Sequence, residues 1–464
     1  MKPVTLRLMV LRCLLGAIVL VSAAVTCHAS TGGVTADARE AQVDALFAVI
    51  AGKDAPGASV LVLRSGRVLL KKGYGFANVE HRVPNTPDTK FRIGSVTKSF
   101  TALAILQLQE AGKLGLDDSI ATYLPGVPNG DRVTVRHLLT HTSGFLNSEK
   151  DPLEFTPGER INYSNTGYKL LGKIVEAVSE TSWEDYLQAH IFAPAGMRDT
   201  GCDHTERILP RRSSGYFFDG KGGYLNAPPE DISQTAWAAG ALYSTVEDMA
   251  RFQEALSSGK LLRLETITQA FTPNRLTDGT ETKYGFGWMI ADYRGVREIC
   301  HGGDTDGHNA VFAMYPNQHL TVIVLSNVCM RPPGPLPSSL NLGRSIAAIY
   351  LGDAMQPETV VRELVLTPEQ MQAFVGRYRL GGRQDVLDAG GDTITVAIQE
   401  RRLVAFNDTN RLELCAESEN AFYARTDSNT KLRFLRDEQG HVTGLIARVM
   451  DVVELRGTRL PDTE

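Results

Sequence analysis

Ser95-Val96-Thr97-Lys98 is the segment of this 464-residue chain whose residue types and spacing most directly suggest chemistry. It follows Gly94, where an extended pattern gives way to a helical one. Residues three apart share a helix face, so the Lys98 amine is expected beside the Ser95 hydroxyl. A serine becomes a useful nucleophile when a base is held next to it, and burial can lower the pKa of a lysine for that task. The ordinary alternatives are an N-cap serine and a solvated helix lysine.

A second polar pattern, Tyr163-Ser164-Asn165, follows further along the chain. A tyrosine hydroxyl can relay a proton between a serine and a leaving group. The Asn165 amide can donate to a substrate carbonyl and accept from an amide. By itself such a tripeptide is more often a turn, so it indicates a catalytic site only in combination with the Ser95 and His301 patterns.

The third pattern is His301-Gly302-Gly303, expected at the end of a strand. Its two glycines would let a substrate backbone lie close to that edge. His301 would bind a substrate carboxylate or support Tyr163, the alternative being an ordinary strand-end histidine. We expect the backbone N–H groups of Ser95 and Asp304 to form an oxyanion hole.

The elements that must position these residues follow from periodicity. Alternating residues predict a hairpin of two strands at 58–64 and 67–74, and helical spacing predicts a helix ending near residue 111. Short helical runs broken by Gly and Pro fill 114–236, and strands return at 287–293, 298–301, 310–315 and 321–326. The simplest assembly is an antiparallel sheet flanked by helices from both chain ends, with an inserted helical lobe.

A second domain is expected after Gln356, because the remaining sequence consists almost entirely of short alternating strands. Such strands with regular turns predict a small all-β barrel. The predicted organisation is therefore a signal peptide at 1–29, a main domain at 30–356 and a C-terminal domain at 357–464.

The N-terminus has the pattern of an export signal, with Lys2, Arg7 and Arg12 before an apolar run and a cleavage site before Ser30. A retained anchor is the alternative. No later segment is long and apolar enough to span a membrane. A net charge of -5 without a basic stripe excludes nucleic acid as an expected partner.

No metal or cofactor is expected. His137 and His141 have a spacing that zinc ligands can have, but no Glu stands between them as in metalloproteases. The cysteine spacing matches no metal framework, and we expect free, buried thiols at Cys300 and Cys329, on strands separated by one other strand. Absence of a Gly-x-Ser-x-Gly elbow argues against an α/β-hydrolase.

Taken together, these motifs resemble the serine β-lactamase and penicillin-binding protein superfamily, in its class C-like branch. The likeness runs from about residue 42 to 350 and rests also on segments 138–144, 163–168, 239–245 and 284–288. The tail, with Phe374 to Tyr378, resembles the β-rich domain that many hydrolases of this branch carry. The resemblance implies an α+β β-lactamase/transpeptidase-like fold. It also implies Ser95 as acylated nucleophile, Lys98 and Tyr163 as the proton-handling pair, and Asn165 as a substrate contact.

One departure from the family pattern concerns the third motif, where class C β-lactamases carry Lys-Thr-Gly and this chain has His301-Gly302-Gly303. A histidine is mostly neutral above its ordinary pKa of about 6.5, so the permanent charge that grips a β-lactam carboxylate is missing. The expected function is therefore an exported bacterial serine hydrolase, periplasmic or extracellular, acting on a peptide, amide or small ester. A class C-like β-lactamase is one alternative, and a penicillin-binding sensor or peptide-binding protein with slow or no turnover is another. The oligomeric state and the natural substrate stay open.

Overall fold

The computed structural model describes residues 36–146, 148–329, 336–357, 363–381, 393–407, 411–425, 427–449 and 453–461. The predicted signal peptide lies outside the described residues. Within them, no helix combines the length and apolar character that crossing a membrane requires.

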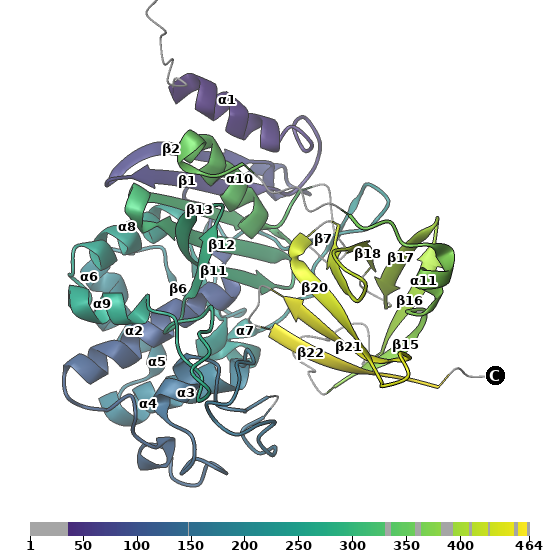
Figure 1. Cartoon of the computed structure of the whole chain (residues 1–464). Helices are drawn as coiled ribbons and strands as arrows, with labels where there is room; N and C mark the ends of the chain where they lie inside the picture. Colours follow the sequence, from purple (N-terminus) through teal and green to yellow (C-terminus); the bar gives the residue numbers. More distant parts are fainter. Residues whose placement is uncertain are drawn as a thin grey trace, which may run out of the picture. The chain divides into compact units, whose positions relative to one another are not determined.

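The centre of the main domain is a six-stranded antiparallel sheet in the order β10-β11-β12-β13-β1-β2 (Figure 1). Its strands are β1 (Ala58–Arg64), β2 (Arg67–Tyr74), β10 (Met289–Tyr293), β11 (Val296–Thr305), β12 (His308–Tyr315) and β13 (Leu320–Ser326). The predicted hairpin of β1 and β2 is confirmed at both strands. The predicted end of the strand at His301 is wrong, because β11 continues to Thr305.

Two hydrophobic cores cover the faces of this sheet, because successive side chains of a strand point to opposite faces. In β1, Val60 and Val62 pack into the core beneath α1 (Ala36–Leu46) and α10 (Ser339–Leu351), from the two ends of the domain. Leu61 and Leu63 pack into the other core, with α2 (Thr97–Glu110) and α8 (Val246–Ser257). α2, which follows Ser95, is thereby fixed against the sheet.

A helical lobe and three small sheets complete this domain. The helices are α3 (Val135–Leu139), α4 (Asn165–Ser179), α5 (Trp183–Leu187), α6 (Ala193–Ala195), α7 (Ile232–Thr235) and α9 (Leu264–Ala270), with single turns at Gly94–Val96, Ile120–Thr122, Gln188–Phe192, Trp237–Ala239, Pro316–Gln318 and Gly352–Ala354. The small sheets are β5-β9-β6, β14-β7-β8 and β3-β4. Their strands are β3 (Phe76–Asn78), β4 (Val83–Pro84), β5 (Phe91–Arg92), β6 (Gly201–Cys202), β7 (Tyr216–Phe218), β8 (Tyr224–Asn226), β9 (Leu242–Ser244) and β14 (Val328–Cys329).

The C-terminal part is a closed eight-stranded barrel with its own core, as predicted. Helix α11 (Pro368–Gln372) precedes the strands β15 (Gly376–Leu380), β16 (Thr393–Gln399), β17 (Arg402–Phe406), β18 (Arg411–Ala416), β19 (Ala421–Ala424), β20 (Asp427–Arg436), β21 (Val442–Val449) and β22 (Val453–Arg459). The predicted fold class, an α+β domain followed by a small all-β barrel, is confirmed. The boundary predicted at residue 356 stays a prediction.

Four cysteines lie among the described residues, and all are free and buried: Cys202, Cys300, Cys329 and Cys415. The expectation of free thiols at Cys300 and Cys329 is confirmed, but its reason is wrong. Cys300 lies in β11 of the central sheet, whereas Cys329 lies in β14 of a different sheet.

Candidate active site

Ser95 lies on a tight turn between β5 and α2. The turn is held by a backbone hydrogen bond of 2.9 Å from the Ile93 N–H to the carbonyl of Leu242 in β9. The Thr97 hydroxyl, at the start of α2, accepts from the Leu242 N–H at 3.2 Å. Ser95 itself is half-buried, so its hydroxyl lies at the N-terminal end of the helix without being enclosed.

The turn that carries Ser95 lies directly against the backbone of β11. β10 pairs with β11 only as far as Cys300, while β12 pairs with it as far as Thr305. A methyl group on Gly303 would lie 1.9 Å from the Ile93 carbonyl oxygen, and one on Gly94 would lie 2.8 Å from the Asp304 nitrogen. Gly94 also has a φ of +50°, which glycine adopts without strain. These two glycines allow the close approach that an oxyanion hole between Ser95 and Asp304 requires.

The Lys98 side chain is fully buried beneath Ser95. Its Nζ donates to Ser95 Oγ at 3.0 Å, to Asn165 Oδ1 at 2.8 Å and to the Ala239 carbonyl oxygen at 2.8 Å. An ammonium group has three donors, which matches these three acceptors in number. A neutral amine would keep the two bonds to Asn165 and Ala239, whose oxygens only accept, and turn its lone pair to the Ser95 hydroxyl. The geometry therefore accommodates Lys98 both as a charged ammonium and as a neutral amine that can accept the Ser95 proton.

Tyr163 and Asn165 are positioned by His141, a buried histidine with a φ of +58°. Its carbonyl accepts from the Asn162 N–H at 2.8 Å, and its Nδ1 accepts from the Ser164 N–H at 3.0 Å. The Tyr163 ring lies on the His141 ring with centroids 4.2 Å apart. Asn165 is the first residue of α4, which begins there because Ser164 Oγ accepts from a backbone N–H one turn on.

The Lys98 ammonium group also contacts Tyr163. The Lys98 Nζ lies 4.7 Å from the centroid of the Tyr163 ring, a distance typical of a cation–π contact. Ser95, Tyr163 and Asn165 thus surround the ammonium group of Lys98, although the chain brings these residues from two distant segments.

His301 lies behind this group and is fully buried. Its Nδ1–H donates to the Gly302 carbonyl at 2.6 Å, and its Nε2 accepts from the Tyr284 hydroxyl at 2.9 Å. Burial, together with the nearby Lys98 charge, lowers the pKa of His301 to about 3. Burial raises the pKa of Tyr284 well above its usual range, so this hydroxyl stays protonated and donates. His301 is therefore neutral at physiological pH, and its ring centroid is 6.3 Å from that of Tyr163.

Three residues of this arrangement had no role assigned from the sequence: His141, Ala239 and Tyr284. Each lies in a segment that carries the family resemblance, which is the signal that pointed to them. His141 contributes the face of its ring, Ala239 its main-chain carbonyl and Tyr284 its hydroxyl group. No sequence pattern specifies contacts of these kinds.

The histidine pair considered for zinc does not form a metal cluster in the described part of the chain. His137 Nδ1 accepts from the Thr134 N–H at 3.2 Å in a capping box at the start of α3. The His141 ring packs against Tyr163, and its Nδ1 accepts from the Ser164 N–H.

Comparisons with known proteins agree with a nucleophilic serine site on this fold. Residues 43–334 match the Beta-lactamase family. Penicillin-binding protein 4* of Bacillus subtilis (strain 168) is 31% identical over 320 residues, which cover 61% of this chain and 70% of that protein. The octameric penicillin-binding protein homologue from Pyrococcus abyssi aligns with a TM-score of 0.61 and 25% identity over 90% of this chain and 99% of that one. A D-stereospecific amidohydrolase from Streptomyces sp. aligns with a TM-score of 0.54 and 26% identity, over 68% and 99% of the two chains.

The fold and the matches define a serine hydrolase. More particularly, this chain belongs to the Beta-lactamase family, together with penicillin-binding proteins.

Proposed function

We propose that this chain hydrolyses an amide, peptide or small ester through an acyl-enzyme at Ser95, with a D-amino-acid or peptidoglycan-type peptide as the substrate class. The observation that carries the proposal is the fully buried Lys98 amine, bonded at once to Ser95, Asn165 and Ala239. A buried amine is costly unless it is used, and a protein that only binds a peptide has no need of it.

In the proposed reaction, Ser95 Oγ attacks the substrate carbonyl and its proton passes to neutral Lys98. The oxyanion accepts from the N–H groups of Ser95 and Asp304. Tyr163 gives a proton to the departing amine or alcohol, and protonated Lys98, whose Nζ lies 4.7 Å from the centroid of the Tyr163 ring, then returns a proton to Tyr163. A water molecule then gives a proton to Tyr163 as Tyr163 passes its own proton to neutral Lys98, and the resulting hydroxide attacks the acyl carbon. The product acid leaves, and protonated Lys98 returns its proton to the Ser95 oxygen.

The support for a D-amino-acid amide or peptide comes from the amidohydrolase of Streptomyces, which is D-stereospecific by its name, and from the penicillin-binding relatives. Efficient β-lactamase activity is disfavoured, because the buried, neutral His301 supplies no positive charge for a β-lactam carboxylate. We propose that His301 acts instead through Tyr284, as a positioning residue behind Tyr163.

The test combines intact mass with substrate turnover. The mature chain is incubated with a penicillin and with paired D- and L-amino-acid amides, and adduct formation and ammonia release are followed over time. Wild type should acquire a lasting penicillin adduct and cleave a D-amide, whereas Ser95→Ala should do neither. Ser99→Ala is the matched control, since Ser99 is a buried serine one turn along, in α2, whose hydroxyl donates to the Gly287 carbonyl. Normal turnover by Ser95→Ala would overturn the proposal. Rapid hydrolysis of penicillin by the wild type would indicate a β-lactamase instead.

We also propose that the chain is exported to the periplasm or the exterior of a bacterium, on the pattern of residues 1–29. N-terminal sequencing of protein secreted by a bacterial host should begin at Ser30. A full-length N-terminus on cytosolic protein would refute it.

A further inference from the structure

Away from Ser95, the side chains of Glu184, Cys202 and His204 bring a carboxylate oxygen, a thiol sulfur and an imidazole nitrogen within 4.8 Å of one another. Glu184 lies on α5, Cys202 ends β6, and His204 lies on the loop that follows. Cys202 is buried and the other two are half-buried. Tetrahedral zinc holds such ligand atoms about 3.5 Å apart, so the half-buried side chains of Glu184 and His204 have to rotate to adjust the present separations.

The orientation of the His204 ring suits metal ligation. Its Nε2 faces Glu184 Oε2 at 2.8 Å, and its Nδ1 faces Glu206 Oε1 at 3.7 Å. Ligating histidines characteristically direct their second nitrogen to a carboxylate, which fixes the tautomer and makes the ligand more basic. The exposed Glu206 carboxylate has to move closer to accept from Nδ1, and the direct contact between Nε2 and Glu184 has to open when both bind the ion.

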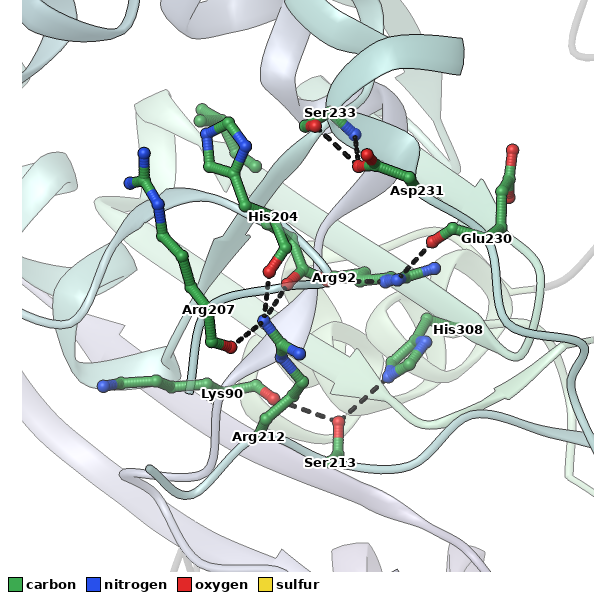
Figure 2. Close-up of polar contacts among 12 residues, drawn as sticks. Lys90, Arg92, His204, Arg207, Arg212, Ser213, Glu230, Asp231, Ser233 and His308 are labelled. Carbon is green, nitrogen blue, oxygen red and sulfur yellow. Dashed lines mark hydrogen bonds and ion pairs between the residues drawn. The ribbon is translucent and has the colours of Figure 1, made fainter. Parts of the chain in front are cut away.

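The backbone that carries Cys202 and His204 is held rigidly by the residue between them. Asp203 is fully buried, and its carboxylate pairs with Arg92 at 2.7 Å and with Arg212 at 2.6 Å. Figure 2 shows the Arg212 guanidinium bonded to the carbonyls of His204 and Arg207, with the His204 ring pointing away from it. The backbone on either side of Asp203, which carries two of the three ligands, is therefore held in place before any ion binds.

A cavity of about 200 Å³ adjoins this cluster, and Glu184, Cys202, Gln188, Arg207 and Tyr243 are among its lining residues. The cavity leaves room for a water molecule or a small anion as a fourth ligand. Three protein ligands with one open position are the arrangement in which zinc retains an exchangeable ligand.

We propose that Glu184, Cys202 and His204 bind a zinc-type divalent transition-metal ion. The mixture of one thiolate, one imidazole and one carboxylate favours such a metal over calcium or magnesium, which prefer oxygen ligands. On binding, Cys202 loses its thiol proton to solvent and coordinates as thiolate. The ion connects α5 of the helical lobe to β6, whose neighbour β9 holds the turn before Ser95.

Cobalt(II) is the probe, because a cobalt–thiolate bond gives a charge-transfer band that zinc lacks. Chelator-treated full-length chain should bind one equivalent of cobalt with this band, and zinc should displace it. Cys202→Ser should lose the band, His204→Ala should weaken binding about a hundredfold, and Glu206→Gln about tenfold. The matched control Cys415→Ser removes another free, buried cysteine and should behave as wild type.

Thermal unfolding supplies a second readout. A ligand that binds only the folded state raises the Tm, so zinc should raise the Tm of wild type and of Cys415→Ser but not that of Cys202→Ser. A far-UV circular dichroism spectrum and a cooperative unfolding transition establish that each variant is folded. If Cys202→Ser does not fold, Glu184→Gln takes its place and should bind cobalt at least tenfold more weakly. Absence of the charge-transfer band in wild type, or its persistence in Cys202→Ser, would overturn the proposal.

Discussion

The substitution Gly303→Ala tests whether the close approach of β11 sets the position of the nucleophile. The new methyl group would lie 1.9 Å from the Ile93 carbonyl oxygen and 3.0 Å from the Ser95 nitrogen. A Cβ essentially never approaches a backbone atom closer than 3.0 Å, so the turn and β11 must separate by at least about 1.1 Å, the difference from 1.9 Å. Because both partners are backbone, no side-chain rotation can relieve the overlap.

A displacement of about 1 Å at a reacting centre can cost about a hundredfold in rate. The expected result is therefore a loss of about a hundredfold in the second-order rate of Ser95 modification by a fluorophosphonate probe. Overpacking should also lower the free energy of unfolding by about 1–3 kcal/mol. Labelling is measured by stopped-flow fluorescence, and unfolding by urea titration.

Gly302→Ala is the matched control in the adjacent position of the same strand. Its methyl group would meet only the Ala310 carbonyl oxygen at 3.7 Å, an ordinary contact. This variant should be labelled within a few-fold of wild type. Equal labelling rates for Gly303→Ala and Gly302→Ala would refute the argument that this contact positions Ser95.

Three further predictions concern the base Lys98, the buried His308 and the domain boundary. Replacing Lys98 with Met should slow labelling of Ser95 by about a hundredfold to ten-thousandfold, because the buried base is lost; a change below fivefold would exclude Lys98 as that base. Burial, with the nearby Arg92 charge, lowers the pKa of His308 to about 3. As the pH falls, this histidine is therefore protonated in the unfolded chain before it is protonated in the folded chain. Its contribution to the free energy of unfolding is full above about pH 6.5 and is lost toward pH 3. Urea titration should show that His308→Gln abolishes about 2 kcal/mol of the stability loss between pH 7 and pH 5, and an unchanged pH dependence would contradict this. Residues 30–356 alone should unfold cooperatively and label at Ser95, because the barrel has a separate core; failure to fold in calorimetry would contradict the predicted boundary.

Local patterns in the sequence determined much of the fold. The strands β1 and β2 were predicted with the bounds that the structure shows, because two runs of strand-forming residues joined by Ser65-Gly66 can be recognised from neighbouring residues alone. The helical spacing of Ser95 and Lys98 likewise places amine and hydroxyl together without any tertiary information. The all-β character of the tail followed from its repeated short alternating strands.

The surroundings of those residues were decided only by the tertiary structure. The Lys98 amine bonds the Ala239 carbonyl across 141 positions of sequence, and any residue type offers the same carbonyl. The sequence predicts a strand end at His301, but β11 continues past it and the histidine is fully buried. Burial and the nearby Lys98 charge lower its pKa, so the histidine is neutral. Glu184 meets Cys202 and His204 only because α5 packs near β6. Residue types and local periodicity are properties of the sequence, whereas burial and long-range contacts exist only once the chain has folded.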